Sequence, residues 1–173
     1  EDVTATIDLT PLNSGFNNAF NLSGSGGLYS GTNGADASTM NEGTFALTYS
    51  VEDGAGNTAT DGSLNVTIDN TNPIGSLNSH FTNIDPPTIS GTGISDAITA
   101  TANLIVEIQI DGTGFNAATN PGDGTWSYTP GGGIGDGNYD LDLRITDEAG
   151  NQFTESITDG LKIDTDPPGV AIT

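Results

Sequence analysis

The chain has 173 residues, of which 25 are glycine, 8 are proline and none is cysteine. Its 23 acidic and 2 basic side chains give a formal net charge of -21, which argues against a nucleic-acid partner and an anionic membrane surface. The missing cysteines exclude disulfides and thiolate metal sites, and no apolar run of about 18 residues predicts a membrane span. Runs rich in Thr, Val and Ile, separated by Gly, Asn, Asp and Pro, predict an all-β protein.

The opening stretch, "EDVTATIDLTPL", begins at Glu1 without a basic or apolar leader, so we expect any signal peptide to lie outside this sequence. It resembles the second strand of a β-sandwich domain more than the first. Further along, "GTFALTYSV" alternates apolar and polar residues and predicts a strand that ends at the turn "DGAGN", Asp53 to Asn57.

A repeat organises the chain. Residues 42–57, "EGTFALTYSVEDGAGN", align without a gap on residues 136–151, "DGNYDLDLRITDEAGN", at an offset of 94 residues. Downstream, "VTIDNTNP" at 66–73 is echoed by "LKIDTDPP" at 161–168. A repeat of this length is the size of one small sandwich domain. We therefore predict two tandem immunoglobulin-like β-sandwich domains, at residues 1–72 and 73–166, with residues 167–173 starting a following repeat.

The second repeat reads as seven short strands separated by glycine-rich turns. The alternation in "NYDLDLRIT" points Tyr139, Leu141, Leu143 and Ile145 inward, and Trp126 is more typical of a core than of a sugar-stacking platform. The predicted strands, in chain order, are 73–77 with 86–93, 97–103, 104–110, 114–119, 124–130, 138–146, and 153–158 with 161–164.

Several motifs of this second repeat together resemble a known family. "DGTWSYTP", "DGNYDLDLRITDEAGN" and "IDTDPP" are similar to the bacterial immunoglobulin-like tandem repeats of large surface adhesins and biofilm-associated proteins. The resemblance covers nearly all of residues 73–166 and is looser over residues 1–72. It implies extracellular stalks built from repeats in series, often with calcium at the domain junctions.

The repeated turn, "DGAGN" and "DEAGN", has Asp at one end and Asn at the other. These side chains can bond the backbone of their own turn, or they can offer the oxygen ligands that Ca²⁺ prefers. In a seven-strand domain the turn before the last strand faces the incoming linker, so the linker can complete a junction site. The expected calcium ligands are Asp69, Asn72, Asp147 and Asn151 at the internal junction, Asp53 and Asn57 at a preceding one, and Asp164 and Asp166 at a following one. Asp85 and Asp96 are weaker candidates, because turn capping explains both.

Three functions fit these features. The first is a calcium-stiffened spacer of a large extracellular bacterial adhesin, whose partners are neighbouring repeats of the same chain. The second is a module that binds a glycan or a protein receptor, and the third is an accessory domain of a secreted enzyme. Catalysis within the chain is not expected, since the sequence has no Cys, a single His and no "GxSxG" motif.

The tail "GVAIT", residues 169–173, has the pattern of a strand with no domain after it. Either the tail is disordered, or it adds to the first domain of another molecule and builds weak head-to-tail chains.

Overall fold

The computed structural model describes residues 3–25 and 27–170, and the side chain of Ser63 is not described. The chain divides into two compact units, residues 1–70 and residues 71–173. The fold is all-β, as predicted, with two short 3-10 helices, η1 (Ala37–Thr39) and η2 (Thr101–Asn103). No helix in the described ranges is long and apolar enough to cross a membrane.

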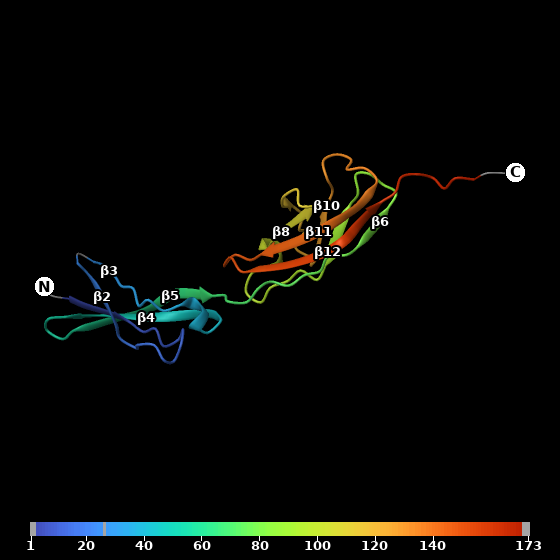
Figure 1. The fold of residues 1–173 in the computed structure, drawn as a ribbon. Helices are drawn as coiled ribbons and strands as arrows, with labels where there is room; N and C mark the ends of the chain where they lie inside the picture. Colours follow the sequence, from blue (N-terminus) through green and yellow to red (C-terminus); the bar gives the residue numbers. More distant parts are fainter. Residues whose placement is uncertain (1–2, 26, 171–173) are drawn as a thin grey trace. The chain divides into compact units, whose positions relative to one another are not determined.

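Unit 2 is a sandwich of two sheets (Figure 1). The larger sheet has the strand order β6-β12-β11-β8-β9, and the smaller sheet pairs β10 with β7. All neighbours are antiparallel except β6 and β12, which run parallel. The bounds are β6 (His80–Thr82), β7 (Ile89–Thr92), β8 (Ile105–Ile110), β9 (Asn116–Ala117), β10 (Thr125–Tyr128), β11 (Gly137–Thr146) and β12 (Gln152–Ile163).

The core of unit 2 lies between its two sheets and follows the predicted alternation. Leu141, Leu143 and Ile145 of β11 are fully buried. On the neighbouring strand β8 of the same sheet they pair with Ile110, Ile108 and Val106, respectively. Trp126 is only 1% exposed and its indole N–H donates to the carbonyl of Ser76 at 3.1 Å. This confirms Trp126 as a core residue and removes it as a platform for a sugar ring.

Tyr139 closes the Gly-rich loop that precedes β11. Its hydroxyl donates to the carbonyl oxygens of Ile134 at 2.9 Å and Gly135 at 3.1 Å, which is the tyrosine-corner arrangement expected of such sandwiches. Asp85 ties down the same loop, because its carboxylate accepts the backbone N–H groups of Ile134 and Gly135.

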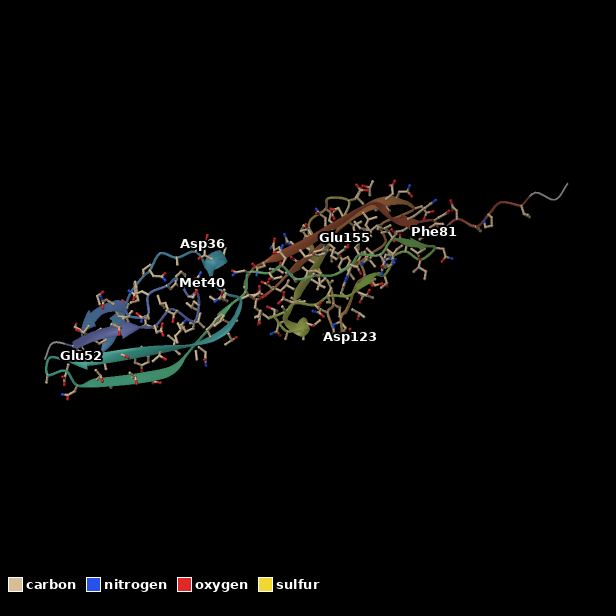
Figure 2. All side chains as sticks on the ribbon, turned by 90° about the horizontal axis from the view of Figure 1, so that it is seen from below. Asp36, Met40, Glu52, Phe81, Asp123 and Glu155 are labelled. Atoms are coloured by element: carbon tan, nitrogen blue, oxygen red, sulfur yellow. The ribbon has the colours of Figure 1, made fainter. Side chains whose placement is uncertain are left out.

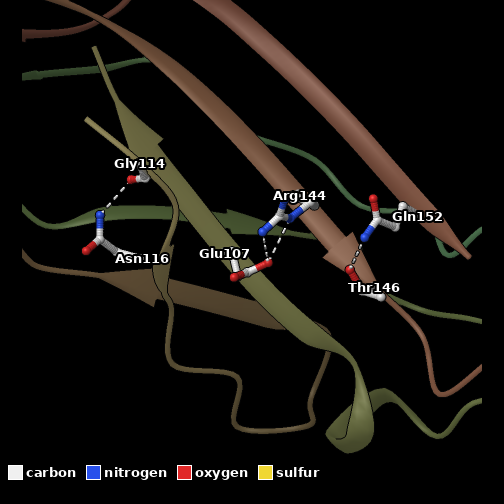
Figure 3. Close-up of polar contacts among 6 residues, drawn as sticks. All are labelled: Glu107, Gly114, Asn116, Arg144, Thr146 and Gln152. Atoms are coloured by element: carbon white, nitrogen blue, oxygen red, sulfur yellow. Dashed lines mark hydrogen bonds and ion pairs between the residues drawn. The ribbon is translucent and has the colours of Figure 1, made fainter. Parts of the chain in front are cut away.

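The outer face of the β8–β11–β12 layer is polar. Figure 3 shows Arg144 of β11 beside Glu107 of β8, with 2.7 Å between a terminal guanidinium nitrogen and a carboxylate oxygen. The same guanidinium lies 4.1 Å from the ring centroid of Phe115. Asp142 accepts the hydroxyl of Ser156 across the neighbouring strand, so this carboxylate belongs to the polar outer face.

One predicted strand of unit 2 is wrong. Residues 97–103, "AITATAN", form bends and the 3-10 helix η2 instead of a strand. The cause is Asp96, whose Oδ1 accepts the backbone N–H groups of Ile98 at 2.8 Å and Thr99 at 2.7 Å and turns the chain. Thr99 is buried and its hydroxyl accepts the N–H of Glu148, which fixes the bend against the turn after β11.

Unit 1 forms a single sheet of order β3-β2-β1-β4-β5 in the part that the structure describes. All its pairs are antiparallel. Its small core contains Leu9, Leu12 and Leu47, packed by partly buried side chains such as Met40, labelled in Figure 2 next to η1. The bounds are β1 (Val3–Ile7), β2 (Phe20–Ser25), β3 (Leu28–Ser30), β4 (Gly43–Asp53) and β5 (Thr58–Ile68).

The sequence repeat extends to the structure, because matched strands of the two units pair in the same register. Gly43 pairs with Ile68 as Gly137 pairs with Ile163, and β1 pairs with β4 as β8 pairs with β11. The opening strand β1 therefore matches β8, which was predicted as the third strand of its repeat, so its prediction as a second strand is wrong.

Candidate functional site

The "DEAGN" turn of unit 2 is built around one carboxylate. Asp147 directly follows β11, and its backbone N–H donates to the carbonyl of Asn151 at 3.1 Å. Its Oδ1 accepts the N–H of Asn151 and its Oδ2 accepts the side-chain amide of Asn151, both at 2.8 Å. The Asp and Asn at the two ends of the motif thus bond each other across the turn.

The "DGAGN" turn of unit 1 repeats this geometry. Asp53 Oδ1 accepts the N–H groups of Ala55 and Asn57 at 2.9 Å, and its Oδ2 accepts the side-chain amide of Asn57 at 2.8 Å. The two turns differ in burial, because Asp147 is 4% exposed while Asp53 is half-buried. Asp and Asn therefore make the same turn bonds in both repeats, and burial singles out Asp147.

Hydrogen bonding lowers the pKa of Asp53, with the side-chain amide of Asn57 as the largest cause and the Asn57 N–H next. Because the pKa of Asp53 is lower in the folded state than in the unfolded state, these bonds stabilise unit 1 at any pH above the unfolded pKa. This stabilisation is lost as the pH falls through the folded pKa. We predict that Asn57→Ala raises the pKa of Asp53 toward the ordinary value of an aspartate, 3.8, measured by NMR titration of the carboxyl carbon. An unchanged pKa would show that the amide does not bond the carboxylate in solution.

Asp96 stands beside Asp147 at one end of unit 2. Carboxylate oxygens of the two residues lie within 4.8 Å of each other. Asp96 Oδ1 caps the bend described above, whereas its Oδ2 is buried and has no hydrogen-bond partner among the described residues. From the sequence, turn capping explains Asp96, but in the structure capping occupies only one of its two oxygens.

This end of unit 2 is the end at which the chain enters. Ile74 pairs with Ser95, with backbone N–O distances of 2.9 and 3.1 Å in the two directions, and Ser95 is the residue before Asp96. Pro73 is fully buried. The "DEAGN" turn therefore lies beside the first residues of its own unit, which is where strand parity predicts it.

The other predicted ligands have different surroundings. Asp69 is half-buried and directly follows β5, and Asn72 is exposed. Asp164 and Asp166 are exposed at the far end of unit 2, where they line a hollow with Phe81, Thr82 and Asn83. Asp164 is held there by its N–H, which donates to the carbonyl of Thr82 at 3.1 Å.

The arrangement offers oxygen ligands only. Two carboxylates within 4.8 Å repel each other, and the buried Oδ2 of Asp96 has no donor in the described part of the chain. Hard cations such as Ca²⁺ bind six to eight oxygens from carboxylates, amides and carbonyls, so the pair Asp96 and Asp147 fits part of such a site.

Comparison with known proteins agrees with the sandwich of unit 2. The family model described as "Bacterial Ig-like domain" matches residues 75–165. No curated protein sequence matches the chain. Because the matched segment spans more than half of the 173 residues and coincides with the two-sheet unit, the chain belongs to the bacterial Ig-like domain family.

Proposed function

We propose that the chain is a pair of spacer repeats from a large extracellular bacterial adhesin, stiffened by Ca²⁺ at the domain junctions. Domains of this family often occur in surface proteins and are typically non-catalytic. The internal repeat supports the spacer role, since a unit copied in series extends a stalk without needing a separate site in each copy. The buried indole of Trp126 weighs against the glycan-binding alternative.

The observation that carries the calcium part is the pair Asp96 and Asp147. A cation between them would bind the buried Oδ2 of Asp96 and offset the repulsion between two carboxylates within 4.8 Å. Asn151 is the amide ligand that we assign to the same ion. The net charge of -21 favours cation uptake generally, because the compact chain otherwise repels itself.

The linker supplies the remaining ligands in this proposal. Asp69 lies five residues before Ile74, which pairs beside Asp96, so chain connectivity keeps Asp69 within about 18 Å of Ile74. This tether supports Asp69 and Asn72 as ligands from the linker. By the repeat, Asp53 and Asn57 would serve a junction with a preceding repeat, and Asp164 and Asp166 a junction with a following one.

Calcium removal tests the proposal. We expect the melting temperature of unit 2 in millimolar Ca²⁺ to exceed that in EDTA, because extracellular modules bind with dissociation constants of about 10⁻⁴ to 10⁻³ M. At ten times the dissociation constant, one site adds about 1.4 kcal/mol to the free energy of unfolding. Calorimetric titration gives the stoichiometry, and a matched ionic strength of NaCl is the control for screening. Equal melting temperatures in Ca²⁺ and EDTA would reject the calcium part and leave the spacer role standing.

A further inference from the structure

Unit 2 has a pocket at one end of its sandwich, where β8 and β10 end and β11 begins. The "DEAGN" turn follows the other end of β11. The pocket has a volume of about 370 Å³, within the range of roughly 300–1,000 Å³ typical of ligand pockets. Its apolar lining includes Tyr128, Ile134 and Tyr139, and its polar lining includes Asp111 and Asn116. We call it the Tyr128 pocket.

The apolar wall of the Tyr128 pocket is held in place by hydrogen bonds. The N–H groups of Ile134 and Gly135 donate to the Asp85 carboxylate at 2.8 and 2.9 Å. The carbonyl oxygens of the same two residues accept the Tyr139 hydroxyl. Because a glycine-rich loop has many accessible conformations, these four bonds select one of them and fix both Ile134 and the Tyr139 ring. The wall is therefore formed before a ligand arrives.

The polar wall is also fixed. The N–H of Asp111 donates to the carbonyl of Asp140 at 2.9 Å, and Oδ1 of Asp111 accepts the N–H of Asp140 at 3.4 Å. Asp111 has a φ of 52°, a left-handed conformation that Asp and Asn adopt more readily than most residues. Figure 3 shows Asn116 on the same segment, with its side-chain amide donating to the carbonyl of Gly114 at 2.9 Å.

Three polar groups of the lining have no hydrogen-bond partner in the described part of the chain. They are the second carboxylate oxygen of Asp111, the side-chain oxygen of Asn116 and the hydroxyl of Tyr128. Two of the three groups only accept hydrogen bonds, and the lining contains no Lys, Arg or His. The Tyr128 pocket therefore suits a ligand that donates hydrogen bonds, and it disfavours an anion.

The same unit already binds one guanidinium with a carboxylate and an aromatic ring. A guanidinium nitrogen of Arg144 lies 2.7 Å from the Glu107 carboxylate, and the guanidinium carbon lies 4.1 Å from the ring centroid of Phe115. The Tyr128 pocket offers this combination again, with the carboxylate of Asp111 and two tyrosine rings. Its chemistry therefore matches a guanidinium.

The 173 residues do not themselves supply this guanidinium. Arg144 and Lys162 are the only basic residues, and the Lys162 ammonium lies 5.1 Å from the ring centroid of Phe81. Both basic side chains are thus already in contact with an aromatic ring. The tail "GVAIT" has no basic side chain, and its residues 171–173 lie outside the described residues. A second copy of the chain has the same two basic residues, so the occupant comes from a different protein.

We propose that the Tyr128 pocket binds an arginine side chain of a partner protein, with the guanidinium against the tyrosine rings and paired with Asp111. A guanidinium stacks on aromatic rings and donates to a carboxylate at the same time. The net charge of -21 attracts a basic partner and raises its rate of encounter. A neutral sugar would use the same acceptors but would gain nothing from this charge. The binding is separate from the pair Asp96 and Asp147 and needs no calcium.

NMR titration of the intact 15N-labelled chain tests the proposal, in EDTA and with N-acetyl-arginine methylamide as the probe. We expect the amide signals of Asp111, Asn116 and Ile134 to shift. N-acetyl-citrulline methylamide has a neutral group of nearly the same shape as the guanidinium and should bind about tenfold more weakly. Binding of the arginine probe should also weaken from low to physiological salt, because salt screens charges in a pocket open to water.

Asp111→Asn removes the charge and keeps a residue type that tolerates the left-handed φ. This variant should bind the arginine probe no more tightly than the parent binds the citrulline probe. Asp159→Asn is the matched control, because Asp159 is exposed, has a φ of 51° and lies outside the Tyr128 pocket. The control variant should bind the arginine probe like the parent.

The comparison of the two probes needs no substitution, so misfolding of a variant does not affect it. Equal affinities of the parent for the two probes would overturn the proposal and indicate a neutral ligand such as a sugar. Equal losses in Asp111→Asn and Asp159→Asn would assign the binding to the general acidic charge and overturn it too. Pocket amide signals that stay unshifted at the highest soluble concentration of the arginine probe would likewise reject it.

Discussion

Replacing Trp126 by alanine is expected to lower the free energy of unfolding of unit 2 by about 3–5 kcal/mol. The side chain is 1% exposed and packs in the core between the two sheets. Its removal also leaves the carbonyl of Ser76 without the indole donor at 3.1 Å. Gly91 pairs with Trp126 and has no side chain that could fill the space. The indole packs directly on its backbone, because a Cβ on Gly91 would lie 2.5 Å from the indole nitrogen.

Tyr29→Ala is the matched control for this loss. Tyr29 is an aromatic residue of β3 in unit 1, where β3 pairs with β2 and the side chain is only half-buried. We expect a clearly smaller loss for Tyr29→Ala. Urea unfolding followed by circular dichroism measures both variants, because Trp126 is the single tryptophan and its fluorescence disappears with it. Equal losses for the two substitutions would contradict the buried position of Trp126.

The strongly alternating strands could be predicted from the sequence because successive side chains of a strand point to opposite faces, so the apolar positions are the ones that the sheet buries. In β11 every second residue is apolar, and Leu141, Leu143 and Ile145 are fully buried. The repeated "TDG" is a subtler signal, since it marks the β-bulge of each long hairpin. The pairing register shifts next to Asp61 in unit 1 and next to Asp159, with φ of 51°, in unit 2.

Other elements depend on contacts that no local pattern contains. Residues 97–103 alternate like a strand, and a single side chain, Asp96, bends them into η2. The pairing of β3 also follows from tertiary context. This strand pairs with β2 in a unit whose described residues form no second sheet, whereas in unit 2 the strand β10 pairs with β7 in a second sheet.

Only part of the candidate site could be predicted from the sequence, because one of its residues depends on a contact between distant segments. The "DEAGN" repeat and strand parity identify Asp147 and its end of the domain. Asp96 joins it from a distant bend, and its role depends on which of its two oxygens is engaged. Only the structure shows that capping uses Oδ1 and leaves Oδ2 buried beside Asp147.

Asp147→Ala is expected to abolish the stabilisation of unit 2 by calcium, a loss of about 1.4 kcal/mol at ten times the dissociation constant. Asp147 supplies one of the two clustered carboxylates and is 4% exposed, so no water-facing group can replace it. In EDTA the same variant loses the turn bonds to Asn151 but also loses the repulsion from Asp96, and these two effects oppose each other. The difference in melting temperature between Ca²⁺ and EDTA therefore isolates the cation.

Two controls assign the effect to the site. Asp142→Ala removes a carboxylate from the solvated outer face and should leave the calcium shift of unit 2 unchanged. Asp53→Ala removes the same turn bonds in unit 1 and should lower the stability of unit 1 without changing the calcium shift of unit 2. If Asp147→Ala and Asp142→Ala weaken the shift equally, calcium acts on the general acidic charge of the chain. A calcium shift that survives Asp147→Ala would leave turn chemistry as the whole reason for the repeated Asp and Asn.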